Sequence, residues 1–143
     1  METERAAPLV FEGVWAGYGT RTVLEDVGFT LRRGALTGLI GPNGSGKSTL
    51  IKVTLGLLRP WRGRVQVLGM DPAEARERVG YMPQIELVDW DFPLSVAEAV
   101  LLGRYGRLRR LRPPSAADQT AVRAALERVG LWHLRDRPIG ELS

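Results

Sequence analysis

Residues 41–49, with the sequence GPNGSGKST, constrain this chain more than any other feature. A short apolar run at residues 35–40 precedes them and is typical of a strand buried on both faces of a sheet. A nearly continuous apolar stretch over residues 47–58 predicts a helix buried on most of its sides. A glycine-rich loop between a buried strand and a helix is the setting of a phosphate-binding loop. The sequence therefore predicts an α/β fold built around such a loop.

Each part of this loop has a mechanical role in binding phosphate. Its glycines permit positive φ, so successive backbone N–H groups turn inward, and the helix that begins near Lys47 adds unpaired amides. The Lys47 ammonium reaches the β- and γ-phosphates, the Ser48 hydroxyl suits Mg²⁺, and Thr49 lies on the α-phosphate side. We therefore predict Lys47 as catalytic and Ser48 as a metal ligand. The predicted nucleotide-binding residues of the loop are Gly41, Pro42, Asn43, Gly44, Ser45, Gly46, Lys47, Ser48 and Thr49.

Composition narrows the class of protein. The 143 residues are 44% apolar, which predicts one globular domain, complete or incomplete. The net charge of +4 admits anionic ligands, whereas nucleic-acid binding would need a clustered basic face, so no nucleic acid is expected. Cysteine is absent and His133 stands alone, so neither a disulfide nor a thiolate metal site is expected. No secretory signal and no apolar run of roughly 18 residues is present, which predicts a soluble, cytoplasmic chain.

Strands and a short helix are predicted around the loop. Residues 9–14 and 22–31 predict an antiparallel pair. Residues 65–68 and 79–82 predict two more short strands. The pair Asp71-Pro72 predicts a helix start, with Asp as the cap and Pro at the first position.

Helical character dominates the second half of the chain. A capping box at Ser95 opens a predicted helix to about residue 102, and a second predicted helix runs from Ser115 to a stop at Gly130. A basic run lies between them. Its simplest interpretation is a solvated helix end and linker, and contact with a membrane partner, lipid headgroups or nucleic acid stays open. The run consists of Arg104, Arg107, Arg109, Arg110 and Arg112.

The full loop sequence, GPNGSGKSTL, is more specific than a general phosphate-binding loop. It resembles the ABC ATPase family, the ATPases that drive membrane transporters. Residues 15–19, WAGYG, resemble the aromatic A-loop of that family. Residues 23–27, VLEDV, resemble its second strand, and residues 79–84, VGYMPQ, resemble its Q-loop. The resemblance runs from about Leu9 to Ser143.

The resemblance implies an α/β fold: a P-loop NTPase core, with a mixed sheet and an antiparallel β edge, and the start of a helical subdomain. The core takes residues 1–84, from the A-loop through the phosphate loop to the Q-loop. Residues 85–143 form the Q-loop exit and the helical subdomain, truncated before the second half of the core. The fold is expected to be incomplete.

ATP and Mg²⁺ are the implied cofactors, with two further site residues. Tyr18 offers a flat face on which adenine stacks, and the alternative is a half-buried turn tyrosine. Trp15, its rival, lies inside the strand pattern and is expected to pack in the core. Gln84 is implied to be catalytic, with its amide oxygen touching Mg²⁺ or the attacking water, and the alternative is a polar loop residue.

Residues 87–93, LVDWDFP, and 101–106, LLGRYG, look like one branch of the family, the ATPases of manganese, zinc or iron importers. Asp89 and Asp91 lack His or Cys partners and are interpreted as a solvated loop. The implied function couples Mg-ATP binding and hydrolysis to metal-ion transport. The implied partners are an integral membrane permease, a second ATPase subunit in a homodimer and an extracytoplasmic substrate-binding protein. The chain would then lie on the inner face of the cell membrane.

The last residues, Glu141 to Ser143, match the start of the family's signature motif, Leu-Ser-Gly-Gly-Gln. The family's Asp for Mg²⁺, its water-activating Glu and its His switch would lie downstream. The resemblance therefore implies an ATPase, but these residues by themselves should bind better than they catalyse. The sheet would also lack strands that flank the phosphate-loop strand, which exposes its edges.

Two other interpretations stay open. One is a truncated nucleotide-binding module without ATPase activity of its own. The other is an ABC-type ATPase of DNA repair or translation, or another P-loop enzyme such as a kinase. The combination of Tyr18, Lys47 and Gln84 argues against a kinase, and the large insertions of repair relatives are not visible in the sequence.

Overall fold

The computed structural model describes residues 7–83, 93–104 and 113–142. The chain divides into two compact units, Met1–Gly80 and Tyr81–Ser143, and each has a hydrophobic core. The boundary predicted between residues 84 and 85 lies outside the described residues and stays a prediction.

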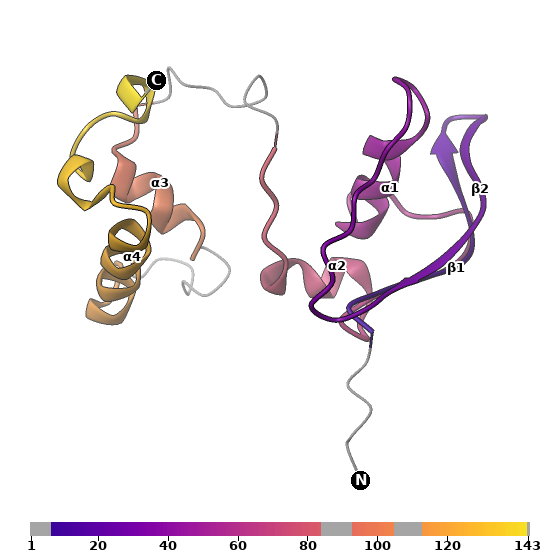
Figure 1. The fold of residues 1–143 in the computed structure, drawn as a ribbon, viewed down its shortest axis with the longest axis horizontal. Coiled ribbons are helices and arrows are strands. Elements are labelled where there is room, and N and C mark those ends of the chain that lie inside the picture. The colour runs from indigo at the N-terminus through magenta and orange to yellow at the C-terminus, as the bar shows by residue number, and fades with distance from the viewer. Residues whose placement is uncertain (1–6, 84–92, 105–112, 143) are drawn as a thin grey trace, which may run out of the picture. The chain divides into compact units, whose positions relative to one another are not determined.

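The first unit contains three antiparallel strands in the order β2-β1-β3, and Figure 1 labels β1 and β2. Strand β1, Leu9–Tyr18, and strand β2, Arg21–Leu31, form a hairpin in which Gly19 has a φ of 56°. Strand β3, Arg62–Val67, pairs with the other edge of β1. The predicted antiparallel pair is confirmed, and so is the α/β class, although the described sheet is antiparallel throughout.

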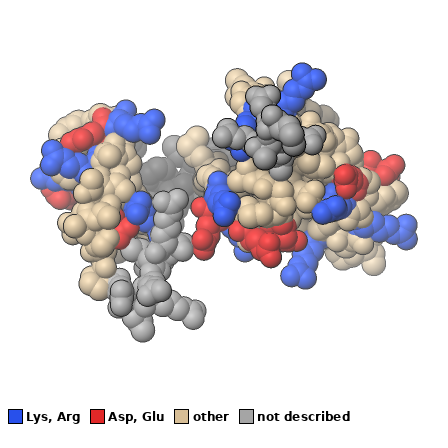
Figure 2. Space-filling model, turned by 90° about the horizontal axis from the view of Figure 1, so that it is seen from below, with Lys and Arg blue, Asp and Glu red and all other residues tan. Residues whose placement is uncertain are grey.

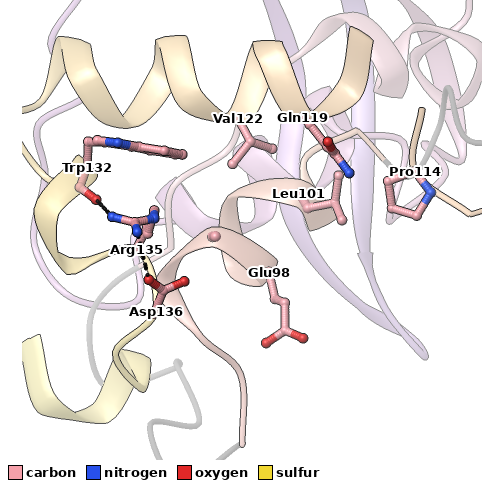
Figure 3. Close-up of a pocket in the computed structure, with 9 residues that line it drawn as sticks. Glu98, Leu101, Pro114, Gln119, Val122, Trp132, Arg135 and Asp136 are labelled. Atoms are coloured by element: carbon pink, nitrogen blue, oxygen red, sulfur yellow. Dashed lines mark hydrogen bonds and ion pairs between the residues drawn. The ribbon is translucent and has the colours of Figure 1, made fainter. Parts of the chain in front are cut away.

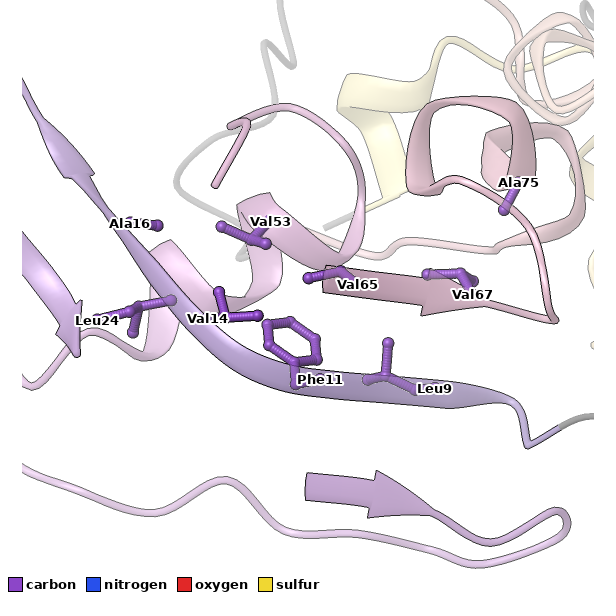
Figure 4. Packing of buried hydrophobic residues seen from close by; sticks show 9 residues of the cluster. All are labelled: Leu9, Phe11, Val14, Ala16, Leu24, Val53, Val65, Val67 and Ala75. Atoms are coloured by element: carbon purple, nitrogen blue, oxygen red, sulfur yellow. The ribbon is translucent and has the colours of Figure 1, made fainter. Parts of the chain in front are cut away.

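The core of this unit lies between the sheet and helix α1, Lys47–Thr54 (Figure 4). The pairing of β1 with β2 shifts register between Phe11 and Val14, where Gly13 has a φ of 56°. Such a bulge resets the alternation of the strand, so the buried residues on both sides of it share one core. Phe11 also stacks on Phe29 of β2, with ring centroids 4.7 Å apart. The buried core residues are Leu9, Phe11, Val14, Ala16, Leu24, Val53, Val65, Val67 and Ala75.

Helix α1 is shorter than the helix predicted over residues 47–58 because Gly56 turns the chain, with a φ of 63°. A Cβ on Gly56 would lie 2.7 Å from the backbone nitrogen of Ala73, so helix α2, Pro72–Ala75, packs closely against this turn. The predicted cap of α2 is confirmed, since Asp71 Oδ1 accepts a hydrogen bond of 2.8 Å from the Ala73 N–H. The turn after α1 is therefore held by tertiary packing as well as by its glycine.

Arg76 also fastens the end of α1 from a distant part of the chain. It begins the 3-10 turn η1, Arg76–Arg78, which follows α2. Its Nε donates to the carbonyl of Leu55 at 2.9 Å, and its Nη2 donates to the carbonyl of Gly56. A cationic donor suits this position because the last carbonyls of a helix lack partners and carry partial negative charge.

Three expectations about burial and strands in this unit are wrong. Residues 35–40 form no strand, with Leu36 fully exposed and Ile40 95% exposed, and residues 79–82 form no strand either. Helix α1 buries only Thr49 and Val53. A strand needs hydrogen-bonded neighbours and covering layers, and the described strands place neither beside residues 35–40. An apolar run without such neighbours gains nothing from becoming a strand.

The second unit is helical. Helix α3, Val96–Leu102, and helix α4, Ala116–Arg128, are followed by the 3-10 turns η3, Trp132–Leu134, and η4, Ile139–Leu142. Both predicted helices are confirmed, and each begins with a capping box. Apolar spacing of three or four residues puts the buried side chains of each helix on one face. The buried core of the unit consists of Val96, Val122 and Leu126.

The second capping box is reinforced by a neighbouring cation. Asp118 accepts hydrogen bonds from the Ser115 hydroxyl at 2.6 Å and from the Ser115 N–H at 3.0 Å. Arg104, just after α3, donates from Nε to Asp118 Oδ1 at 2.5 Å. The Ser115 hydroxyl is the largest cause that lowers the pKa of Asp118 to about 2, and Arg104 is the next. A carboxylate at the start of α4 thus ties the two helices together.

Candidate functional site

The last three residues of the glycine-rich loop are the first three of α1, and two of its three glycines have the positive φ that the loop chemistry requires. Gly44 has a φ of 81° and Gly46 has a φ of 93°. Gly46 is also sterically confined, because a Cβ there would lie 3.1 Å from Leu24 Cδ2. A side chain at residue 46 would therefore be strained by its backbone and by its neighbours.

The amino-terminal end of α1 is free of a side-chain cap. Its N-cap residue is Gly46, which makes no side-chain hydrogen bond, and no acidic residue occupies the first turn. The first amides of a helix lack partners within the helix and carry partial positive charge. Such an end attracts an anion, and phosphate is the anion that a glycine-rich turn in front of it best accommodates.

Lys47 folds back over the loop. Its Nζ donates to the carbonyl oxygens of Gly41 and Pro42, at 2.7 Å each. These two bonds place the ammonium beside the turn formed by residues 42–45, where Pro42 also accepts from the Ser45 N–H at 3.3 Å. A full positive charge thus lies next to the uncapped helix end.

A pocket joins this helix end to the β1–β2 hairpin. Ser48 is exposed at the pocket, whereas Thr49 is only 5% exposed and contacts the hairpin side. Tyr18, at the end of β1, is 46% exposed and contributes to the same wall. The lining residues are Tyr18, Arg21, Val23, Gly44, Gly46, Ser48 and Thr49.

Tyr18 is held by polar groups of α1. Hydrogen bonding by the Thr49 side chain is the largest cause that lowers the pKa of Tyr18, and hydrogen bonding by Lys52 is the second. The Lys52 ammonium lies over the Tyr18 ring, 5.3 Å from its centroid. Trp15, the rival for the same role, is partly buried within β1 and does not line the pocket. Of the two aromatic residues, Tyr18 is thus the one beside the loop.

Two residues of this pocket are missing from the sequence-based prediction. Arg21 faces Tyr18 across the hairpin, as its direct partner in the pairing of β1 with β2. Val23 lies two residues further along β2, on the same side of the strand. The signal was available, because a two-residue turn at residues 19–20 fixes which residues lie opposite one another.

Several predicted positions lie outside the described residues. They include Gln84, the aspartates at 89 and 91, Ser143 and the basic run beyond residue 104. Arg104 is described: its side chain is 26% exposed and paired with Asp118, so it is not the solvated side chain of the simplest interpretation. Basic and acidic side chains are interspersed on the faces that Figure 2 presents.

The second unit has a separate pocket with an apolar floor (Figure 3). Leu101, Val122 and Trp132 line it, and the Arg135 guanidinium lies 4.8 Å from the Trp132 ring centroid. Arg135 also pairs with Asp136 at 3.2 Å. In the described parts of the chain, no three His, Cys, Asp or Glu side chains gather where they would hold a metal ion. None of the described helices has the length and apolar character needed to cross a membrane.

This chain matches a family model and is similar to several ATP-binding proteins of metal transport systems. A family model described as "ABC transporter" matches residues 24–143. The manganese transport system ATP-binding protein MntB of Bacillus subtilis is 44% identical over 95% of this chain and 54% of its own length. MntA of Synechocystis, also a manganese transport system ATP-binding protein, is 47% identical over 92% of this chain and 52% of its own length. The zinc transport system ATP-binding protein TroB of Treponema pallidum is 44% identical over 88% of this chain and 47% of its own length.

Solved structures give the same result for the fold. A nucleotide-free ATP-binding cassette from an ABC transporter matches with a TM-score of 0.78 and 30% identity, over 96% of this chain and 60% of that one. An ATP-binding cassette of an ABC transporter in its ADP conformation matches with a TM-score of 0.75 and 30% identity, over 96% of this chain and 59% of that one. The chain spans about half the length of the curated relatives it matches.

Proposed function

The chain belongs to the ABC transporter family, and on that premise we propose that residues 41–49 and Tyr18 bind ATP. The observation that carries the proposal is the pocket that Tyr18 shares with the loop and with the start of α1. An aromatic face and an uncapped helix end with an adjacent ammonium suit the two ends of a nucleotide. The base would stack on Tyr18, and the phosphates would bind the loop amides and Lys47.

Mg²⁺ fits the donor set of the same pocket. Ser48 is exposed at the first turn of α1, and a hydroxyl oxygen is a ligand that this hard cation accepts. We propose Ser48 and Gln84 as the ligands from this chain and Lys47 and Gln84 as its catalytic residues. Mg²⁺ would neutralise charge on the phosphates, while Lys47 would hold the β- and γ-phosphates in place.

The transport function is proposed from the relatives. Three of them are named for manganese or zinc transport, and a fourth, from Yersinia pestis, is named for chelated iron transport. ATP binding and hydrolysis would drive import of such a metal ion through a membrane permease. A second ATPase subunit and an extracytoplasmic substrate-binding protein would complete the assembly, at the inner face of the cell membrane.

Calorimetric titration of the purified chain with Mg-ATP tests the binding proposal. We expect saturable binding that Lys47→Ala abolishes or strongly weakens. Arg59→Met, which removes a charge outside the pocket, serves as the control and should leave the affinity unchanged. An unsaturable wild-type titration, or equal affinities for wild type and Lys47→Ala, would overturn the assignment.

Hydrolysis is a separate proposal and needs a separate measurement. Phosphate release from Mg-ATP distinguishes an ATPase from a module that only binds. Turnover that Lys47→Ala removes supports hydrolysis by this chain. Binding without turnover supports the module.

A further inference from the structure

One residue of α1, Lys52, contacts the ring that is proposed to stack on the base. Thr49 and Lys52 are three positions apart, so they share one face of the helix, and both lower the pKa of Tyr18. The Lys52 Nζ lies 5.3 Å from the centroid of the Tyr18 ring, within the range of a cation–π interaction. The helix that begins at the glycine-rich loop therefore also contacts the aromatic residue of the pocket.

The position of Lys52 differs from that of the pocket residues. Tyr18 lines the pocket, together with loop and hairpin residues, whereas Lys52 does not. The ammonium contacts one face of the ring, so the opposite face is open to a second contact. Tyr18 is 46% exposed, so a contact that already orders its ring lowers the entropy that binding would cost.

We propose that Lys52 is a positioning residue for the nucleotide base: its ammonium holds the Tyr18 ring by one face and presents the opposite face to a purine. This inference rests on the proposed function, since it assigns a role at the same site. Lys52 acts through Tyr18 and touches neither the phosphates nor Mg²⁺. Its effect should therefore depend on the presence of a base in the ligand.

The competing explanation for any effect of Lys52 is general electrostatics. A lysine on the helix that binds phosphate also raises the local positive potential, which favours every polyphosphate alike and weakens with salt. Inorganic tripolyphosphate separates the two explanations, because it offers the phosphates without a base.

The experiment measures the affinities of Mg-ATP and magnesium tripolyphosphate for the purified chain by calorimetry. Lys52→Met keeps most of the side-chain stem and removes the charge. We expect Lys52→Met to weaken Mg-ATP binding about three- to fivefold, from the usual strength of an exposed cation–π contact, and to leave tripolyphosphate binding unchanged. Lys52→Arg, which also places a cation over a ring, should restore Mg-ATP affinity. Arg59→Met controls for the loss of one charge near α1.

A double-mutant cycle supplies the second readout. In a Tyr18→Ala background, Lys52→Met should have no further effect on Mg-ATP binding. Equal losses for both ligands, an unchanged Mg-ATP affinity in Lys52→Met, or a full effect in the Tyr18→Ala background would each overturn the inference. Such results would leave the proposed function intact if Lys47→Ala still abolished binding. A wild-type chain that does not bind Mg-ATP would overturn both.

Discussion

At the scale of single residues, Tyr18 lines the pocket, and Lys47 contacts the loop beside it. Lys47 places a full charge beside the loop carbonyls, and Tyr18 offers an aromatic surface. Charge-assisted contacts to phosphate are stronger than stacking on one base. The two residues should therefore contribute unequally to nucleotide affinity.

We expect Lys47→Ala to weaken Mg-ATP binding about 100-fold and Tyr18→Ala about tenfold, because only the first removes a charge from the phosphates. Titration calorimetry on both variants measures the difference. Equal losses, or a larger loss for Tyr18→Ala, would contradict the assigned roles.

The glycines of the loop differ in how much space surrounds a side chain added at each position. Gly44 and Gly46 both have positive φ, but nothing lies within 4 Å of a Cβ built on Gly44, while Gly46 would contact Leu24 at 3.1 Å. We expect Gly44→Ala to lower the free energy of unfolding by about 1 to 2 kcal/mol, from backbone strain alone. Gly46→Ala should cost more because it adds a steric contact. Chemical denaturation checks the order, and a smaller cost for Gly46→Ala would contradict it.

At the scale of elements, the start of α4 depends on an ionised carboxylate. Hydrogen bonds from Ser115 and the contact with Arg104 lower the pKa of Asp118 from 3.8 to about 2. A carboxyl with a lowered folded-state pKa contributes stability that is present above its unfolded pKa and is lost as the pH falls through the folded pKa. The contribution of Asp118 is therefore present above about pH 4 and disappears toward pH 2.

Asp118→Asn tests this linkage, since the amide keeps the shape but cannot ionise. We expect the variant to be less stable than the wild type at neutral pH and the two stabilities to converge between pH 4 and pH 2. Thermal unfolding followed by circular dichroism at several pH values measures both curves. A stability difference that stays constant over this range would rule out the assigned role of Asp118.

At the scale of the whole molecule, the first unit has apolar side chains outside its core. Leu36 and Ile40 are almost fully exposed and Leu39 is 48% exposed. Adjacent exposed apolar residues favour association with other apolar surfaces. The described fold buries Phe11 and Val14 instead and does not use residues 35–40 for its core.

We expect Ile40→Lys to reduce concentration-dependent self-association, measured by sedimentation velocity, without lowering the free energy of unfolding. Phe11→Ala is the contrasting variant, since emptying a buried phenylalanine site costs about 3 to 5 kcal/mol. A clear loss of stability in Ile40→Lys would show that residues 35–40 belong to the core after all.

Local signals in the sequence predicted much of the second unit and part of the first. The capping box at Ser95, the helical spacing after Ser115 and the Asp71-Pro72 pair were sufficient to place three helix starts. The reason is that a cap satisfies nearby backbone amides with one neighbouring side chain, so its energetics are contained in a few consecutive residues. The β1–β2 hairpin is local in the same sense.

Burial could not be predicted in the same way. The apolar run at residues 35–40 has the composition of a buried strand, yet its state depends on strands far away in sequence, and none of the described strands lies beside it. Lys52 was missed for a related reason: its role comes from the hairpin residue that its helix contacts.

The sequence by itself determined the family, and it predicts a phosphate site in the glycine-rich loop, because glycines, one lysine and one hydroxyl at fixed spacing are a local signal. It also determined the helix starts. Only the tertiary structure decided that Tyr18 shares a pocket with the start of α1, that Lys52 covers its ring, and that residues 35–40 are exposed. These properties depend on contacts between segments distant in the chain, and such contacts exist only after the sheet and helix have packed.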